Sequence, residues 1–459
     1  MGIRIKRMEV VKLFGRFDYF INISESESRI SILTAPNGYG KSTILKMINS
    51  FASGDYYYFL RERFEIVRFF LSNETVIEMS HVEEESPSND VGSKSNITRY
   101  ILIRSGLNYT KIKDPFASQD NDEPSFVVDR SLPFLTRIGP RTWRHDRTGE
   151  VIDGIELLSR YGDHPMFKRK IKQEPWLVEI QNSLNVFSIP TNRLKYEEEI
   201  DYRTHGGVKN SLMVGALAKE IEEKMQSAIR NQFEAGRKKE TNFPTRLIES
   251  LKKGIAPTRQ SIIESINSVQ WYEERYGRLG LLPHTETTRQ LNVHAESTEN
   301  AGMLVLKTYL DDVLEKFSLL EDLAQRLDIF CSSINELIAF TKIETSADFG
   351  ILAKVIDGDR KPIPLSVLSS GEQHLIVLIG KLVFNTTQGA LVLIDEPEIS
   401  FHPEWQEKFL SILEDIRKLN GFSVLLATHS PILIGDRWDN VIELAEQYSV
   451  SETESRKEV

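Results

Sequence analysis

The sequence predicts an α/β fold in which a mixed sheet flanked by helices is interrupted by a helical insertion. A glycine-bearing turn at 35–43 follows an apolar strand pattern and leads into a helical one. Residues 391–394 (LVLI) and 423–427 (SVLLA) are short apolar runs, which are typical of buried parallel strands. Between these regions, apolar residues from Leu306 to Ile338 recur with helical spacing.

Length and composition narrow the class of protein. At 459 residues the chain accommodates two or three domains, or one domain with a large insertion. Hydrophobic residues make up 40% of the chain, and the net charge of −10 argues against wholesale coating of nucleic acid. The single cysteine, Cys331, excludes an intrachain disulfide and fits a reducing cytosol. We see neither a signal peptide nor a membrane span, and therefore expect a cytoplasmic protein without membrane contact.

The first half of the chain is expected to be rich in strands. We expect strands within 1–34, a β-hairpin at 64–79, a second strand pair at 97–112 and a short strand at 186–189. Polar, turn-rich loops are expected at 83–96 and 114–125.

From about residue 205 the pattern becomes helical. Apolar positions from Leu306 to Ile338 alternate by four and three residues, an a/d heptad that predicts one continuous helix. The expected partner helix is 212–233, whose apolar stripe is Ala218, Ile221, Met225 and Ala228. The pattern is compatible with two arrangements, a short protruding coiled coil and a helical bundle packed on the body of the protein. Because the stripe carries no catalytic group, we expect it to serve assembly or signalling.

Residues 35–43 (APNGYGKST) match a phosphate-binding loop, with Ala35 in place of the first glycine of the strict pattern. Glycines let backbone N–H groups turn toward phosphate oxygens, and the helix N-terminus adds its dipole. Lys41 is expected to reach the β- and γ-phosphates of ATP, and Ser42 to ligate Mg²⁺. The expected nucleotide-binding residues of this loop are Asn37, Gly38, Gly40, Lys41, Ser42 and Thr43.

Acidic residues end the apolar run that leads to residue 396. Asp395 is expected to act on the metal, and Glu396 to activate the water that attacks the γ-phosphate. A later apolar strand leads to Ala427-Thr428-His429-Ser430, where His429 resembles the switch histidine that senses the γ-phosphate in ATPases of this kind. Each feature alone has an ordinary structural explanation, and their combination with the phosphate-binding loop favours the catalytic one.

The segment Leu368-Ser369-Ser370-Gly371-Glu372 predicts a helix N-terminus with a serine hydroxyl and exposed amides. It resembles the signature motif of ABC ATPases, which implies that Ser369, Gly371 and Glu372 contact the γ-phosphate bound by a second subunit. The phosphate-binding loop, long insertion, signature, acidic pair and histidine follow the order of the ABC/SMC-like ATPases. The resemblance implies ATP hydrolysis with Mg²⁺ by a homodimer, or a higher homo-oligomer, that closes over the nucleotide.

The same resemblance implies an ABC-type P-loop ATPase head with two lobes. The expected segments are a first lobe at 1–204, a helical insertion at 205–343, a second lobe at 344–445 and a loose polar tail at 446–459.

The segment from Leu393 to Trp405, with His402 and Pro403, resembles the OLD-like and RecF-like branch rather than transporters. The KLFGRFDY and APNGYGKSTIL segments resemble stand-alone ATPases of bacterial anti-phage operons, first the PARIS ATPase subunit and second the Septu ATPase. Within this branch, Arg16 matches a phosphate-contacting arginine. The glutamine loop has three candidates, which are Gln119, Gln173 and Gln181.

This resemblance implies a sensor ATPase that controls a separate effector nuclease and responds to a phage trigger protein. The alternative is a RecF-like DNA-repair ATPase that binds duplex DNA. Candidate basic clusters for DNA or an acidic partner are Arg141–Arg147, Lys168–Lys172 and Arg237–Lys239.

Overall fold

The structure is a computed structural model whose chain forms two compact units. Unit 1 comprises Met1–Thr191, Thr386–Ile399 and Asn420–Val459, and unit 2 comprises Asn192–Asn385 and Ser400–Leu419. The described residues are 2–23, 29–86, 96–113, 125, 128–130, 132–146, 148–161, 174–191, 193–196, 211–253, 257–282, 300–356 and 361–448.

Unit 1 contains a five-stranded parallel sheet whose strands come from distant parts of the sequence. In sheet order, the strands are β11 (Val186–Ile189), β17 (Leu391–Asp395), β18 (Ser423–Thr428), β3 (Ile30–Thr34) and β19 (Val441–Glu443). Every neighbouring pair is parallel. All five residues of β3 are buried, as expected for a strand covered on both faces.

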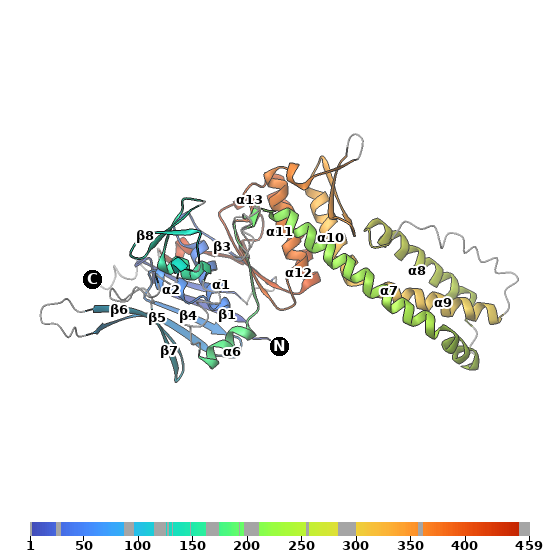
Figure 1. The fold of residues 1–459 in the computed structure, drawn as a ribbon, viewed down its shortest axis with the longest axis horizontal. Helices are drawn as coiled ribbons and strands as arrows, with labels where there is room; N and C mark the ends of the chain where they lie inside the picture. Colours follow the sequence, from blue (N-terminus) through green and yellow to red (C-terminus); the bar gives the residue numbers. More distant parts are fainter. Residues whose placement is uncertain are drawn as a thin grey trace. The chain divides into compact units, whose positions relative to one another are not determined.

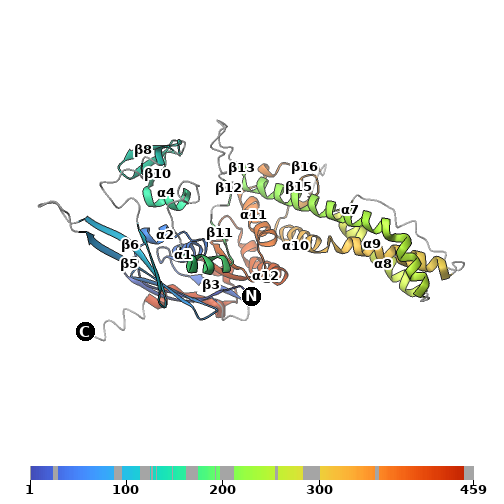
Figure 2. The ribbon, with the colours of Figure 1, turned by 60° about the horizontal axis from the view of Figure 1, so that its bottom comes forward.

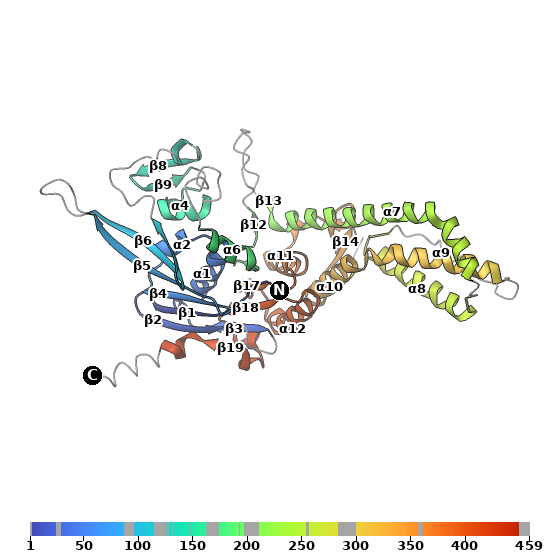
Figure 3. The ribbon, with the colours of Figure 1, turned by 90° about the horizontal axis from the view of Figure 1, so that it is seen from below.

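A six-stranded antiparallel sheet forms the second layer of unit 1. Its strands, in sheet order, are β2 (Phe17–Asn22), β1 (Ile5–Leu13), β4 (Ile66–Leu71), β5 (Val76–Ser86), β6 (Asn96–Ser105) and β7 (Asn108–Lys113). Helix α1 (Lys41–Ser53) shares one core with both sheets and packs against β11, β17 and β18 (Figure 3). The rings of Phe51 on α1 and Phe69 on β4 stack with centroids 4.1 Å apart. This packing holds the start of α1 beside the ends of the parallel strands.

A small subdomain of unit 1 follows the strands of the antiparallel sheet in the sequence (Figure 2). It consists of β8 (Leu135–Gly139), β9 (Thr142–His145), β10 (Val151–Asp153) and α4 (Gly154–Tyr161). Trp143 is fully buried there, and its Nε1 donates a hydrogen bond to Asp129 at 2.8 Å. The basic cluster Arg141–Arg147 therefore has a core residue at its centre. Unit 1 also contains helices α2 (Tyr57–Arg61), α6 (Pro175–Ser183) and α13 (Pro431–Ile434).

Unit 2 is mainly helical. Its helices are α7 (Met213–Lys253), α8 (Arg259–Arg278), α9 (Asn300–Ser318), α10 (Glu321–Leu337), α11 (Ser370–Phe384) and α12 (Pro403–Asn420). Its strands are β12 (Lys195–Tyr196), β13 (Ser211–Leu212), β14 (Thr341–Ser346), β15 (Gly350–Val355) and β16 (Pro362–Ile363). Helices α7, α8 and α9 lie side by side as a bundle (Figure 1), and α7 also packs on β15 and α11.

The prediction of one continuous helix from Leu306 to Ile338 is wrong. Helix α9 ends at Ser318 and α10 begins at Glu321, with Leu320 as the N-cap of α10. Helix α9 packs against α7 and α8, whereas α10 packs against α11 and β14. The heptad spacing continues across the break because both helices bury a similar apolar stripe against different partners.

The expected pairing partner at 212–233 lies within α7, but α9 meets a later part of that helix. Arg246 of α7 forms an ion pair with Asp312, and Lys239 forms another with Glu315. The earlier stripe packs elsewhere in unit 2: a Cβ on Gly350 of β15 would stand 1.8 Å from the Ala218 carbonyl oxygen. The bundle is thus part of a larger helical body, built from three helices rather than one coiled-coil pair.

Most of the local strand predictions are confirmed. The two strand pairs, the strand at 186–189 and the buried strands at 391–394 and 423–427 all form. The predicted loop at 83–96 is wrong at its start, where β5 continues to Ser86; residues 87–95 and 114–124 lie outside the described residues. The tail prediction is wrong for 446–448, which are helical, and 449–459 lie outside them. No described helix is both long and apolar enough to cross a membrane.

Candidate functional site

The phosphate-binding loop connects β3 to α1 in unit 1. Gly38 and Gly40 have φ angles of 89° and 86°, in the left-handed region that glycine adopts readily. A Cβ on Gly40 would stand 2.9 Å from Cδ2 of Leu13, so the loop also packs too closely there for a side chain. Between the two glycines, the Tyr39 carbonyl oxygen accepts a hydrogen bond from Tyr19 Oη at 2.8 Å. The loop is therefore held in shape by strands β1 and β2 as well as by its own sequence.

Lys41 is the first residue of α1 and is only 5% exposed. Its Nζ donates a hydrogen bond across the loop to the Ala35 carbonyl oxygen at 2.8 Å. The ammonium group is thus held over the start of a helix whose first N–H groups lack intrahelical partners. A positive charge beside these N–H groups is well suited to bind an anion such as a nucleotide phosphate. Asn37 and Gly38 are exposed at the tip of the same loop.

Ser42 and Asp395 meet across the end of the parallel sheet. Ser42 Oγ donates a hydrogen bond to Oδ1 of Asp395 at 2.9 Å, and Thr191 Oγ1 donates to Oδ2 at the same distance. Thr191 follows β11, which is the neighbour of β17. Two hydroxyls and one carboxylate supply the oxygen ligands that Mg²⁺ prefers, since this ion keeps several waters and uses few protein groups. The described residues contain no cluster of three or more His, Cys, Asp or Glu side chains that would hold a metal by themselves.

Thr43 is placed differently from Ser42. Its side chain forms a hydrogen bond with the Tyr58 hydroxyl of α2, and burial raises the pKa of that hydroxyl above its usual value. The Thr43 hydroxyl therefore ties α1 to α2, so its backbone N–H is the group available to a phosphate.

Glu396 lies directly after β17 with a φ angle of 43°, an uncommon value for a residue other than glycine. Its backbone N–H donates to the Ala427 carbonyl oxygen at 2.9 Å, which ties the end of β17 to β18. Its side chain is 24% exposed, whereas Asp395 is held against Ser42. The turn therefore directs two consecutive carboxylates to different surroundings.

His429 follows β18 and lies beside the acidic segment after β17. Its ring is half exposed, and Nδ1 is 3.9 Å from Oε1 of Glu396 and 3.2 Å from Oε1 of Glu398. Glu398 is almost fully buried and also accepts hydrogen bonds from Thr428 Oγ1 at 2.6 Å and from the His429 N–H at 3.1 Å. The structure thus places both predicted catalytic residues, Glu396 and His429, next to a second glutamate that the sequence analysis did not single out.

The signature segment lies in unit 2, at the start of α11. Ser369 caps this helix in a reciprocal arrangement: its Oγ accepts from the Glu372 N–H, and Glu372 Oε2 accepts from the Ser369 N–H at 2.8 Å. A Cβ on Gly371 would stand 2.6 Å from the Ser400 carbonyl oxygen. Gly371 is therefore required by packing within unit 2, and Glu372 is engaged as part of a capping box.

Arg16 lies in the turn between β1 and β2 and is exposed. Its guanidinium stands 4.8 Å from the ring centroid of Phe17. The Phe17 ring in turn lies 5.3 Å from that of Tyr39 in the phosphate-binding loop. Arg16 is thus linked to the phosphate-binding loop through the Phe17 ring, which contacts both Arg16 and Tyr39.

Of the three candidate glutamines, Gln119 and Gln173 lie outside the described residues. Gln181 on α6 contacts Tyr56 and packs against Gly54, which caps the far end of α1. It is therefore remote from the phosphate-binding loop along that helix. Thr191, which contacts Asp395, had no sequence signal beyond its place after a short strand.

The basic clusters give no continuous surface among the described residues. Lys168–Lys172 lies outside them, and Lys239 of the third cluster is paired with Glu315.

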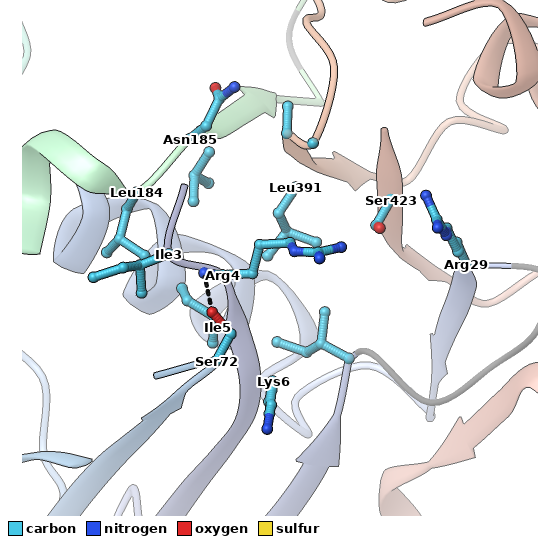
Figure 4. Close-up of a pocket in the computed structure, with 14 residues that line it drawn as sticks. Ile3, Arg4, Ile5, Lys6, Arg29, Ser72, Leu184, Asn185, Leu391 and Ser423 are labelled. Atoms are coloured by element: carbon cyan, nitrogen blue, oxygen red, sulfur yellow. Dashed lines mark hydrogen bonds between the residues drawn. The ribbon is translucent and has the colours of Figure 1, made fainter. Parts of the chain in front are cut away.

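A separate pocket of about 240 Å³ lies at the opposite edge of the parallel sheet, where β11, β17 and β18 begin (Figure 4). Arg4 points into it beside Leu391, and the Arg4 N–H donates to Ser72 Oγ at 3.0 Å. Because the phosphate-binding loop, Asp395 and His429 follow the carboxyl ends of their strands, this pocket does not belong to the candidate nucleotide site.

Comparisons with known proteins agree with an ATPase. The family model described as "AAA domain, putative AbiEii toxin, Type IV TA system" matches residues 219–435. Septu protein PtuA of Bacillus thuringiensis is 25% identical over 297 residues, which cover 62% of this chain and 63% of that protein. Protein ea59 of Escherichia phage lambda is 36% identical over 67 residues, which cover 15% of this chain and 13% of that protein. The chain thus spans less than two thirds of either relative.

Among solved structures, the Smc head domain of Pyrococcus furiosus with an extended coiled coil, bound to the C-terminal domain of ScpA, is similar with a TM-score of 0.33. The sequences are 12% identical, and the match covers 96% of this chain and 93% of that one. An SmcHead bound to the C-winged helix domain of ScpA has a TM-score of 0.35 at 11% identity, with the same coverages. In its motifs and in the match to the Septu protein, the chain resembles ABC/SMC-like ATPases and anti-phage ATPase subunits.

Proposed function

We propose that this chain binds ATP with Mg²⁺ and hydrolyses it at composite sites between two copies, as the sensor subunit of an anti-phage complex. The observation that carries the proposal is the convergence of Lys41, Ser42, Asp395, Glu396 and His429 in one compact unit. These residues come from chain segments more than 350 residues apart and follow the carboxyl ends of three neighbouring strands. Ligands of open α/β sheets bind at this edge.

In the proposed reaction, Lys41 and the N–H groups of the loop bind the β- and γ-phosphates. Ser42 and Asp395 would hold Mg²⁺, which neutralises phosphate charge when it is bound. Glu396 accepts a proton from the attacking water, and His429 orients the γ-phosphate. The remaining contacts would come from Ser369 and the first N–H groups of α11 in a second copy, because a capped helix N-terminus supplies donors for a phosphate.

Glu372 adds a condition to this proposal. Its carboxylate accepts from the Ser369 hydroxyl at 2.7 Å, so a phosphate that takes up this hydroxyl must displace a like charge. Closing of two copies over ATP would therefore require Glu372 to give up its hydrogen bond from the Ser369 hydroxyl. This would make the closed state depend on nucleotide.

The role in defence rests on the similarity to the Septu protein and on the resemblance of the N-terminal motifs to anti-phage ATPases. In this role the chain would bind a separate effector nuclease and respond to a phage trigger protein. Co-expression with the products of the neighbouring genes tests it: a complex with a nuclease that survives size-exclusion chromatography is expected. Tight binding of duplex DNA by the purified chain, without such a complex, would favour the RecF-like alternative.

Turnover and assembly test the enzymatic part directly. Glu396→Gln with ATP and Mg²⁺ is expected to accumulate as a dimer, detected by light scattering, while the same variant without nucleotide does not. A purified chain that binds no ATP would refute the proposed site. A chain that binds ATP and hydrolyses it as a strict monomer would refute the composite arrangement alone.

A further inference from the structure

We infer that Glu398 is a positioning residue that fixes the His429 ring and keeps it apart from Glu396. The inference rests on the proposed function, since it concerns how the histidine of the ATP site is held. Glu398 lies two residues after Glu396, yet its side chain is 6% exposed while that of Glu396 is 24% exposed. The two glutamates therefore have separate tasks in the same short segment.

Two hydrogen-bond donors and one ring nitrogen, from β18 and the residue after it, converge on a single oxygen of Glu398. Oε1 lies 2.6 Å from Thr428 Oγ1, 3.1 Å from the His429 N and 3.2 Å from His429 Nδ1. The carboxylate thus contacts both the backbone and the ring of His429. Contacts at both points fix the side chain relative to the strand that carries it.

The chemistry of the contact sets the state of the ring. An ionised carboxylate oxygen only accepts hydrogen bonds, so Nδ1 must carry the proton for its contact with Glu398 to be a hydrogen bond. Nε2 is then the ring nitrogen left for the nucleotide. To donate to a γ-phosphate oxygen as well, the ring must carry both protons, and the carboxylate beside Nδ1 balances that positive charge.

Glu396 is the alternative partner of the same nitrogen. Its Oε1 is 3.9 Å from Nδ1, whereas Oε1 of Glu398 is nearer, at 3.2 Å. A histidine bound to Glu396 would hold the carboxylate that must receive the proton of the attacking water. By taking Nδ1, Glu398 leaves Glu396 to this task.

The burial of Glu398 supports a role beyond stability. Its Oε2 is buried and has no hydrogen-bond partner among the described residues. A buried carboxylate with one oxygen unsatisfied carries a desolvation cost that an apolar side chain would avoid. Retaining such a group is explained when its charge acts on the neighbouring histidine.

The first test examines the ring without nucleotide. ¹⁵N-histidine NMR of the full chain, with the His429 signals assigned by their loss in His429→Ala, reports which ring nitrogen carries the proton. We expect Nδ1 of His429 to be protonated in the parent and its ¹⁵N shifts to change in Glu398→Gln. Thr428→Val is the matched control, because it removes another donor to the same oxygen and should leave these shifts in place. Unchanged His429 shifts in Glu398→Gln would overturn the inference.

The second test uses steady-state ATP hydrolysis. Glu398→Gln is expected to lower kcat about 10- to 100-fold with KM changed less than about threefold, as for loss of a carboxylate that orients a functional histidine. The Glu398→Gln/His429→Ala double variant should be no slower than His429→Ala, because Glu398 acts through that ring. Additive losses, or an equal loss of kcat in Thr428→Val, would show that Glu398 supports packing of the strand and would overturn the proposal.

Two further outcomes are separable. If Glu398→Gln does not fold, Glu398→Asp takes its place, since it keeps the charge but withdraws it from the ring and should lower kcat likewise. If the parent does not hydrolyse ATP, the proposed function fails, while the NMR experiment still decides whether Glu398 holds His429.

Discussion

Replacing Lys41 with alanine is expected to weaken ATP binding strongly and to change the stability of the nucleotide-free protein little. The ammonium group has three N–H donors, one of which is used by the Ala35 carbonyl oxygen. The other two are available to the β- and γ-phosphates. Hydrogen bonds between charged groups contribute about 1.5–3 kcal/mol each, so their loss amounts to about 3–6 kcal/mol. At about 1.4 kcal/mol per tenfold, Kd should rise by about two to four orders of magnitude.

The effect on the empty protein is expected to be small because two terms oppose each other. Alanine leaves the Ala35 carbonyl oxygen without its donor, which costs about 1 kcal/mol. It also removes a charged group that is only 5% exposed, which offsets part of that cost.

Isothermal titration calorimetry with Mg²⁺–ATP, together with a thermal melt, measures both quantities. Lys46→Ala is the matched control, because Lys46 lies exposed on the same helix and should bind ATP like the parent. A Kd for Lys41→Ala within about tenfold of the parent value would refute the reasoning. Such a change is smaller than the loss of even one hydrogen bond to a charged group would cause.

The remaining predictions concern catalysis, assembly and the helical bundle. Glu396→Gln should bind ATP normally but hydrolyse it about 10²- to 10⁴-fold more slowly, and a parent rate would exclude Glu396 as the base. Ser369→Arg should bind ATP but not hydrolyse it. If the sites are composite, verified mixed dimers of Ser369→Arg and Lys41→Ala should regain partial turnover, and no recovery would argue against composite sites. Phe317→Asp, placed where the ring is 6% exposed and lies 5.6 Å from that of Tyr276, should destabilise the bundle by about 3–5 kcal/mol, as measured by circular dichroism. An unchanged melt would contradict this.

The sequence was sufficient where a feature is encoded locally. The phosphate-binding loop needs glycines with positive φ followed by a helix, and Gly38 and Gly40 satisfy both conditions. The capping box of α11 follows from Ser369 and Glu372 at a spacing of three residues. The apolar runs predicted the buried strands β17 and β18, because strands that are apolar on both faces are typical of parallel sheets covered on both sides.

The sequence failed where the determinant is a contact between distant segments. Thr191 is separated from Asp395 by more than 200 residues, and a lone threonine after a strand has no pattern of its own. In the sequence, Glu398 has no feature that distinguishes it from other acidic residues in turns. Its partners are Thr428, at the end of β18, and His429, which follows that strand. The break near Leu320 was missed for a related reason: spacing identifies an apolar stripe, but not whether one partner or two will cover it.

The order of strands in the parallel sheet has a consequence for synthesis on the ribosome. β3 pairs with β18, with Leu33 opposite Ala427. The pairing of β3 with β18 therefore cannot form until Ala427 has been synthesised. At about 5–20 residues per second, the nearly 400 residues between them take about 20–80 seconds to translate. During this time α1 and the phosphate-binding loop would lack β17 and β18, and the nascent chain would hold its apolar strands unpaired. Nucleotide binding should therefore appear only after nearly the whole chain has left the ribosome, and products truncated before β17 should not bind ATP.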